Sequence, residues 1–446
     1  MKEDYTPIEK VNSWMKNSVT LKFIVITILM LLLLIPLSMI KSIIAERELL
    51  NNQATEEVSS KWAESQQING PILAIPVIYE YQEEDKTNLI TKHLHILPED
   101  LYINGIIEPE KLRRGIYEVA VYKSELSING NFNLDLKIDW ENLKEIKYDQ
   151  SFLTIGVSDL RGIEDQISLN WNNEALTVDP GSKISNIIKT GITINLPDIE
   201  SLINEKVLFD VKLKLQGSQN MSFVPLGATT RVDITSDWTS PGFDGNFLPD
   251  HREVSDEGFK ANWKILQLNR NFPQSWMGGN QRDNMIESSF GVNLILPLDD
   301  YQKSMRSAKY AAMTIALTFL IFFLVEILNG KKIHPFQYAL VGLALSLFYV
   351  LLVSISEHSN FNLAYAASTL GIVTMIALYS LSIFKVKKQT LILVSTLLGI
   401  YGFLFVTLQL TDYALLMGSI GLTVILAATM YFTRHINWYK LNIDTD

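Results

Sequence analysis

The segment from Asp244 to Glu253 reads DGNFLPDHRE and gathers charged side chains around a glycine and a proline. Carboxylates, an imidazole and a guanidinium beside a turn are the groups from which binding loops are built. A hydrolytic use of these groups would need one ligand-sized pocket that they line together. The alternative is that Arg252 and Glu253 pair only to fix the loop. The candidate binding residues are Asp244, Asp250, His251, Arg252 and Glu253.

A second candidate pair is Glu357-His358, which lies in a short polar break between two apolar runs. Asp412 lies in another such break. If both breaks reach the same membrane face, a carboxylate beside the imidazole would make a pH-sensitive contact. The alternative is that these residues only solvate the turns.

Metal and catalytic chemistry find little support in the sequence. His93 and His95 are two apart on a predicted strand, so both rings share one face and could begin a metal site. Because no third ligand stands at a linked spacing, the alternative is an exposed strand face. There is no cysteine and no standard catalytic motif. We expect no enzyme activity, no metal and no cofactor.

Six apolar runs are long enough to cross a bilayer. The first, Phe23 to Ile40, is uncharged and lacks a following cleavage site, which favours an uncleaved signal anchor over a signal peptide. Glu326 is the one carboxylate within a run, and pairing or snorkelling near Lys331 competes with a proton-relay role. The later runs are about 308–329, 336–355, 363–384, 390–410 and 413–432.

Charge orients these runs. Lysines and arginines cluster in the N-terminus, the 331–332 and 385–388 breaks and the C-terminal tail, which indicates that both termini lie inside. Residues 41–305 carry 25 Lys and Arg against 40 Asp and Glu, a net charge of −15, which predicts a solvated acidic domain outside. Such a domain repels nucleic acid, so we expect none as a partner.

The outer region changes from helical to alternating character. Residues 46–66 favour a helix that ends at Asn69-Gly70-Pro71. Alternation then predicts strands near 72–80, 116–122, 132–140, 192–196, 209–215, 231–235 and 290–296, with turns at Asn129-Gly130, Asp179-Pro180-Gly181 and Pro241-Gly242. This pattern indicates antiparallel sheets in a sandwich. Trp263 and Phe259 are predicted to pack beneath the 244–255 segment.

Motifs spread along the chain resemble the CreD family of bacterial inner-membrane proteins, also called cell envelope integrity or colicin-tolerance proteins. The residues that carry the resemblance are Phe247-Leu248-Pro249, Arg252-Glu253-Val254-Ser255, Gly258-Phe259, Ala261, Trp263, Gly70-Pro71, Ala74-Ile75-Pro76, Arg161-Gly162-Ile163, His334-Pro335, Gln337-Tyr338, Leu340-Val341-Gly342-Leu343, Ser356-Glu357-His358, Thr433-Arg434, Ile436 and Trp438-Tyr439. The resemblance implies an inner-membrane location and an envelope-stress context, and it implies no reaction.

The expected architecture combines membrane α-helices with an all-β domain. Residues 1–45 form the cytoplasmic N-terminus and a signal-anchor helix, 46–305 a large periplasmic antiparallel β-sandwich-like domain with an initial helix, and 306–446 a bundle of five transmembrane helices. The expected partners are the lipid bilayer and envelope proteins or glycans. The expected function is non-enzymatic maintenance of envelope integrity and stress or colicin tolerance. A transporter or flippase-like bundle and an unrecognised envelope-directed hydrolase are the alternatives, and the sequence indicates no oligomeric state.

Overall fold

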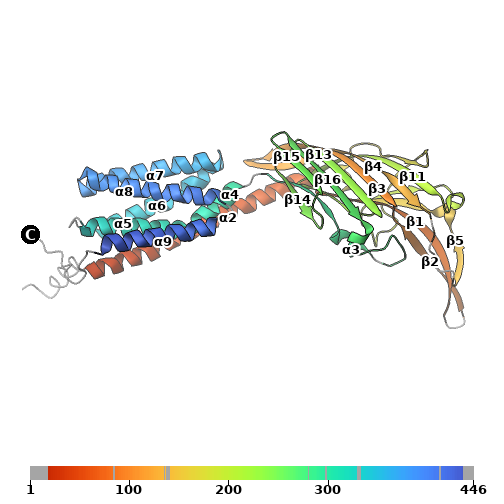
Figure 1. Cartoon of the computed structure of the whole chain (residues 1–446), viewed down its shortest axis with the longest axis horizontal. Helices are drawn as coiled ribbons and strands as arrows, with labels where there is room; N and C mark the ends of the chain where they lie inside the picture. The colour runs from red at the N-terminus through yellow and green to blue at the C-terminus, as the bar shows by residue number, and fades with distance from the viewer. Residues whose placement is uncertain are drawn as a thin grey trace, which may run out of the picture. The chain divides into compact units, whose positions relative to one another are not determined.

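A computed structural model describes residues 19–83, 86–134, 136, 141–279, 281–296, 299–328, 333–410 and 413–434 (Figure 1). The chain divides into two compact units. We call Asn51–Pro297 the β unit, and Met1–Leu50 with Leu298–Asp446 the helical unit. Lys331, Asp412, Ile138, Trp140, Trp438 and the lysines before residue 19 lie outside the described residues.

The first described element, helix α2 (Val19–Trp62), contributes to both units. It contains the whole predicted apolar run and continues through the helix-forming residues after it. Strand β1 (Gln66–Glu83) begins four residues later. Gly70-Pro71 therefore lies within a strand and does not stop the helix, which corrects the expectation. Gly70 has a φ of +151°, and an added Cβ would lie 2.8 Å from the Ile155 Cα, so this position requires glycine.

The first sheet of the β unit has ten strands. Its main path runs β14-β18-β12-β1-β6-β10-β9, and β2, β17 and β5 attach to it through β1 and β2. β1 pairs in parallel with β12, and its other pairings are antiparallel. The bounds are β14 (Pro241–Gly245), β18 (Phe290–Leu294), β12 (Asn220–Phe223), β6 (Phe152–Val157), β10 (Gly191–Asn195), β9 (Asp179–Pro180), β2 (Lys86–Ile96), β17 (Ser275–Met277) and β5 (Leu143–Ile146).

The second sheet has eight strands in the order β15-β16-β13-β3-β4-β11-β7-β8. β13 pairs in parallel with β3. Both sheets are thus mixed, where alternation alone predicted antiparallel pairing. The bounds are β15 (His251–Ser255), β16 (Gly258–Leu266), β13 (Thr229–Ser236), β3 (Asp100–Arg114), β4 (Tyr117–Asn133), β11 (Lys206–Ser218), β7 (Ser168–Trp171) and β8 (Glu174–Leu176).

One continuous hydrophobic core joins the two sheets. β11 shows why the sequence folds this way, because Val207, Phe209, Val211, Leu213 and Leu215 alternate with polar residues and are all buried. The three expected turns differ from the structure, since Asn129-Gly130 lies within β4, Pro241-Gly242 within β14, and Asp179-Pro180 forms β9 with only Gly181 after it. The β unit is a two-sheet sandwich.

The helical unit contains α4 (Asp299–Lys309), α5 (Ala311–Leu328), α6 (Pro335–Ser356), α7 (Phe361–Phe384), α8 (Lys387–Gln409) and α9 (Ala414–Thr433). Among the described residues, α2, α6, α7 and α8 are each long and apolar enough to span a membrane. α4 and α5 satisfy the same criterion together but are bent by 45° at their junction. The apolar part of α9, Leu416–Tyr431, is shorter.

These elements confirm the expected fold class: an N-terminal apolar helix, a central all-β region and a C-terminal group of apolar helices. The sixth predicted span, the directions in which the spans run and the predicted domain boundaries stay predictions.

Candidate functional site

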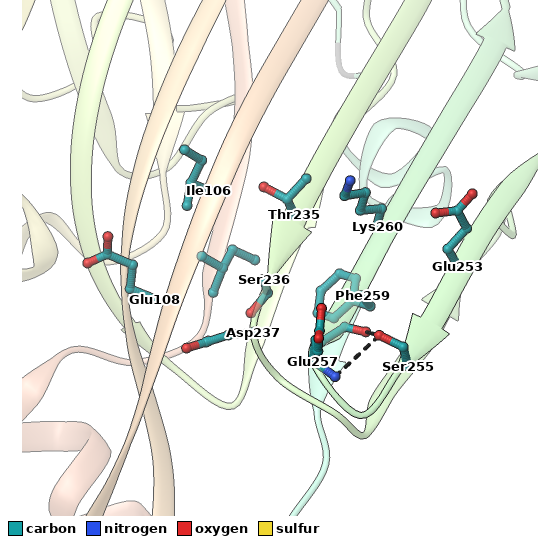
Figure 2. Close-up of a pocket in the computed structure, with 12 residues that line it drawn as sticks. Ile106, Glu108, Thr235, Ser236, Asp237, Glu253, Ser255, Glu257, Phe259 and Lys260 are labelled. Carbon is teal, nitrogen blue, oxygen red and sulfur yellow. Dashed lines mark hydrogen bonds between the residues drawn. The ribbon is translucent and has the colours of Figure 1, made fainter.

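An open groove of about 550 Å³ lies on the second sheet, where β3, β13, β15 and β16 run side by side (Figure 2). The register of the strands determines which side chains lie next to one another in the groove. Ile106 pairs with Thr235, Thr235 with Lys260, and Lys260 with Glu253. Directly paired residues project to the same face of a sheet. The four strands therefore present one row of side chains, which Figure 2 shows extending from Ile106 to Glu253.

The groove is acidic. Glu108, Asp237, Glu253 and Glu257 line it, and Lys260 is the single basic residue in its lining. All five side chains belong to exposed residues, so their charges face solvent rather than the core. Four carboxylates around one concave surface create a negative local potential that attracts cationic groups. Ile106, which is 54% exposed, adds an apolar contact at the same place.

The groove adjoins a free strand edge. All five residues of β15 are exposed, and within the described residues β15 pairs only with β16. The outer backbone N–H and C=O groups of such an edge can pair with an added strand. The site thus combines a negatively charged groove with a template for an extended peptide.

An aromatic cluster supports β15 and β16 from the core side. Trp263 is 2% exposed, and its indole nitrogen donates to the Phe247 carbonyl at 3.2 Å. The Trp263 ring lies 5.5 Å from Phe290 and 5.9 Å from Phe243, and Phe259 lies 5.8 Å from Phe243. The contact with Phe247 confirms that Trp263 packs beneath the 244–255 segment, whereas Phe259 packs against Phe243, the residue just before that segment.

The predicted binding residues of this segment are spread over several places. Asp244 lies in β14 of the first sheet, where its carboxylate accepts from the backbone N of Gly245 and from Asn293. Asp250 accepts from the backbone N of Lys264 at 2.8 Å and so fixes the start of β15. His251 is exposed at the first position of β15.

Arg252 and Glu253 are adjacent on a strand and therefore point to opposite faces. The Arg252 guanidinium lies 5.9 Å from the centre of the Phe243 ring, while Glu253 lines the groove. The two residues do not pair with each other, so the alternative that an Arg252–Glu253 ion pair fixes this segment is wrong. Of the five predicted residues, Glu253 alone lines the groove.

His93 and His95 share a face of β2, as predicted, but this face is not an exposed one. His95 is 1% exposed, and its ring lies 5.1 Å from Trp276 of β17 and 6.2 Å from His93. The expectation of an exposed strand face was wrong because β17 pairs with β2 and covers His95 with an indole. No cluster of three metal-ligating side chains occurs among the described residues.

Burial lowers the pKa of His95 to about 4. In the unfolded chain, the His95 imidazole has the ordinary histidine pKa of about 6.5. The stabilising contribution of neutral His95 is therefore complete above pH 6.5 and is lost as the pH falls to about 4, a change of about 3 kcal/mol. We expect chemical denaturation of His95→Leu to show a weaker acid dependence over this range than the native chain. An equal slope in both proteins would contradict the assignment, and His251→Ala is the exposed control.

Glu357 and His358 follow α6 in the helical unit. The Glu357 carboxylate lies 3.4 Å from Nε of Arg47 and 3.5 Å from the hydroxyl of Tyr301. Glu357 is thus tied to α2 and α4, whereas His358 is exposed. The predicted approach of Asp412 falls outside the described residues. A binding role for Glu357 and His358 stays a prediction.

Within the described part of the helical unit, Glu326 binds three donors. Its buried carboxylate pairs with Lys22 of α2 and accepts from the Tyr338 hydroxyl and from the backbone N of Ile333, both at 2.8 Å. The expected pairing of Glu326 is confirmed, with Lys22 as the partner that the structure describes. Three donors on one carboxylate join α2, α5, α6 and the segment before α6.

Of the acidic residues that line the groove, the sequence indicated only Glu253, and it did not indicate Lys22 as the partner of Glu326. Glu108, Asp237 and Glu257 are isolated acidic residues in the sequence, and only strand pairing brings them to Glu253. In the sequence, Lys22 is one of several N-terminal lysines. Its position one residue before an apolar run was the available signal, because a lysine at that depth needs a partner.

The motif around His334 has a clear structural role. The His334 side chain accepts from the backbone N of Phe336, and Gln337 accepts from the backbone N of His334, which together cap the start of α6. Four residues after Tyr338, which binds Glu326, Gly342 permits close packing: a Cβ there would lie 2.2 Å from Leu33 and 2.9 Å from Phe319.

Arg161-Gly162 has a comparable role in the β unit. The Arg161 guanidinium binds the Asp159 carboxylate through two nitrogens and donates to the Ser60 carbonyl near the end of α2. Asp159 also accepts from the backbone N of Glu64 at 2.9 Å. Hydrogen bonds from Arg161 hold the pKa of Asp159 at about 2, so the carboxylate stays charged and fastens the end of the helix to the sandwich.

Comparison with known proteins agrees with these motifs. The family model described as "Inner membrane protein CreD" matches residues 18–439. The inner membrane protein CreD of Escherichia coli (strain K12) is 34% identical over 417 residues, which cover 93% of this chain and 92% of that protein. The match includes the β unit and all the described apolar helices. The chain belongs to the CreD family of inner membrane proteins.

Proposed function

We propose that this protein maintains envelope integrity and stress or colicin tolerance without catalysis, by binding an envelope component through its β unit. The observation that carries the proposal is the acidic groove beside the free edge of β15. It suits a basic, extended segment of an envelope protein, which would add a strand to β15 and place a cationic side chain among the carboxylates. A hydrolytic role has less support, because Asp244, Asp250 and His251 do not line the groove with Glu253.

The proposal places the β unit in the periplasm and both termini in the cytoplasm. Its support is the bias of Lys and Arg toward one set of breaks between the apolar runs. A cysteine at Ser359 is expected to react with an impermeant thiol reagent in spheroplasts, whereas one at Gln389 should not. The chain has no cysteine of its own, so the background is nil. Labelling at Gln389 alone would invert the proposed topology.

Charge reversal tests the groove directly. The triple variant Glu108→Lys, Glu253→Lys and Glu257→Lys is expected to lose function, because it turns a net negative surface positive and repels a basic partner. The measurement is survival of cells under detergent stress, compared at equal protein abundance. All three side chains are exposed, so the fold should tolerate the changes.

Glu174→Lys is the control for charge reversal away from the groove, because Glu174 is an exposed carboxylate on β8 at the opposite edge of the same sheet. It should keep wild-type survival. Full survival of the triple variant would reject the groove as the functional surface. Equal loss in the control would show that the total charge of the β unit matters and not this site.

A transporter-like bundle is the second candidate, and the 45° bend between α4 and α5 favours it, since transport sites often use broken helices. Against it, Glu326, the one carboxylate within the apolar runs, is held by three donors and has little freedom to exchange partners. The charge-reversal experiment separates the two candidates, because transport through the helices does not need the groove on β15.

A further inference from the structure

A second cavity, of about 350 Å³, lies within the helical unit between α5, α8 and α9. α5 contributes five apolar residues to its lining, and α8 and α9 contribute three residues each. The lining consists of Leu317, Leu320, Ile321, Leu324, Val325, Ile392, Thr396, Ile400, Ile425, Ala428 and Thr429.

The lining offers no free polar group. Its only polar side chains are Thr396 and Thr429, and each hydroxyl donates to a carbonyl of its own helix, Ile392 and Ile425 respectively, at 2.8 Å. A cavity whose hydrogen-bonding groups are all satisfied gains nothing from a polar occupant. In a membrane helix bundle, hydrocarbon is the occupant that such a surface accepts.

α9 makes few contacts that would close this space. Among its residues with described side chains, Gly421 alone is buried, and the Phe403 ring of α8 packs against it. Ala428, farther along α9, is exposed although it faces the cavity. Described side chains therefore leave a space between the second half of α9 and α5.

One end of the cavity is basic. Lys388 lies four residues, about one helical turn, before Ile392 of the lining, so these two side chains are neighbours on the surface of α8. Lys387 and Lys388 are both exposed at the start of α8. Because α8 and α9 are joined by a short connection, they run in opposite directions, and Arg434 after α9 lies at this same end.

We propose that this cavity binds an anionic phospholipid. One acyl chain fills the space between α5, α8 and α9, and the phosphate of the headgroup lies at the end marked by Lys388. The lipid completes the packing of α9, and this role is independent of the groove on the β unit. Each basic residue near a headgroup strengthens binding about fivefold, which makes the affinity depend on lipid charge as well as on the acyl chain.

The test is native mass spectrometry of the delipidated full-length protein, titrated with phosphatidylglycerol or with phosphatidylcholine of the same acyl chains. The native protein is expected to retain phosphatidylglycerol more tightly. Lys388→Gln should weaken phosphatidylglycerol about fivefold and leave phosphatidylcholine unchanged. Ala428→Phe, which fills the cavity, should weaken both lipids.

Leu378→Phe is the matched control, because Leu378 is 65% exposed on α7 and does not line the cavity. It should bind both lipids like the native protein. Equal affinity for the two lipids, or no change in Lys388→Gln, would overturn the anionic site. An equal loss in Leu378→Phe and Ala428→Phe would show that the retained lipid covers the helices generally. Lys388 is exposed, so its variant reports on binding without disturbing the fold.

Discussion

Trp263→Ala is expected to lower the free energy of unfolding of the β unit by about 3–5 kcal/mol. The indole is 2% exposed and contacts Phe243 and Phe290, so alanine leaves a cavity in the core of the sandwich. It also leaves the Phe247 carbonyl without the indole donor. Because Phe247 leads into β15, the groove should be lost together with the stability.

The measurement is thermal unfolding of the full-length protein in detergent, followed by the circular dichroism of its β-sheets. A domain of this size shifts by roughly 2–4 °C for each kcal/mol. Leu268→Ala is the control, since Leu268 is 87% exposed and should leave the midpoint unchanged. An unchanged midpoint in Trp263→Ala would contradict the packing described here.

Glu326→Gln is expected to destabilise the helical unit by about 3–5 kcal/mol, although the two side chains are almost equal in size. The glutamine oxygen can still accept from the backbone N of Ile333, and its amide nitrogen, in place of the second oxygen, can donate to the Tyr338 hydroxyl. Glutamine nevertheless leaves the charge of Lys22 without a counter-ion. The Lys22 side chain is only 15% exposed, so water compensates little.

The double variant Lys22→Gln with Glu326→Gln identifies the cause. It removes both charges and keeps hydrogen-bonding groups at both positions, so most of the lost stability should return. The measurement is the midpoint of thermal aggregation in detergent, with Lys41→Gln, an exposed lysine on the same helix as Lys22, as the control. If the double variant were as unstable as Glu326→Gln, loss of shape rather than an unpaired charge would be responsible.

The sequence was informative wherever the physical signal is local. The uncharged run from Phe23 to Ile40 is long enough to predict a membrane-spanning helix. The alternation of apolar and polar residues in β11 predicts a strand with one buried face. His334-Pro335 marks the start of α6 through capping chemistry that acts within four residues. These elements could be predicted because each depends on neighbours in the chain.

The remaining features depend on pairings between distant residues. Lys22 and Glu326 are 304 residues apart, and no periodicity links them. His95 is predicted on a strand, but its burial depends on Trp276 of β17. The groove likewise exists only because β3 pairs with β13, which places Glu108 near Asp237. Alternation indicates which face of a strand is buried and leaves open which strand is its neighbour.

The two parallel pairings described above also constrain how the β unit folds. β1 cannot complete its pairing until β12 has been synthesised, since Gln66 pairs with Met221. β3 likewise cannot complete its pairing until β13 has been synthesised, since Asp100 pairs with Thr229. While the chain is being synthesised, the hairpin of β3 and β4, which ends at Asn133, therefore keeps an open edge until β13 (Thr229–Ser236), about a hundred residues later, has emerged. Pairing between strands that are far apart in the sequence predicts slow folding with a long-lived, aggregation-prone intermediate. A chaperone or a low rate of synthesis would be required to protect this intermediate from aggregation.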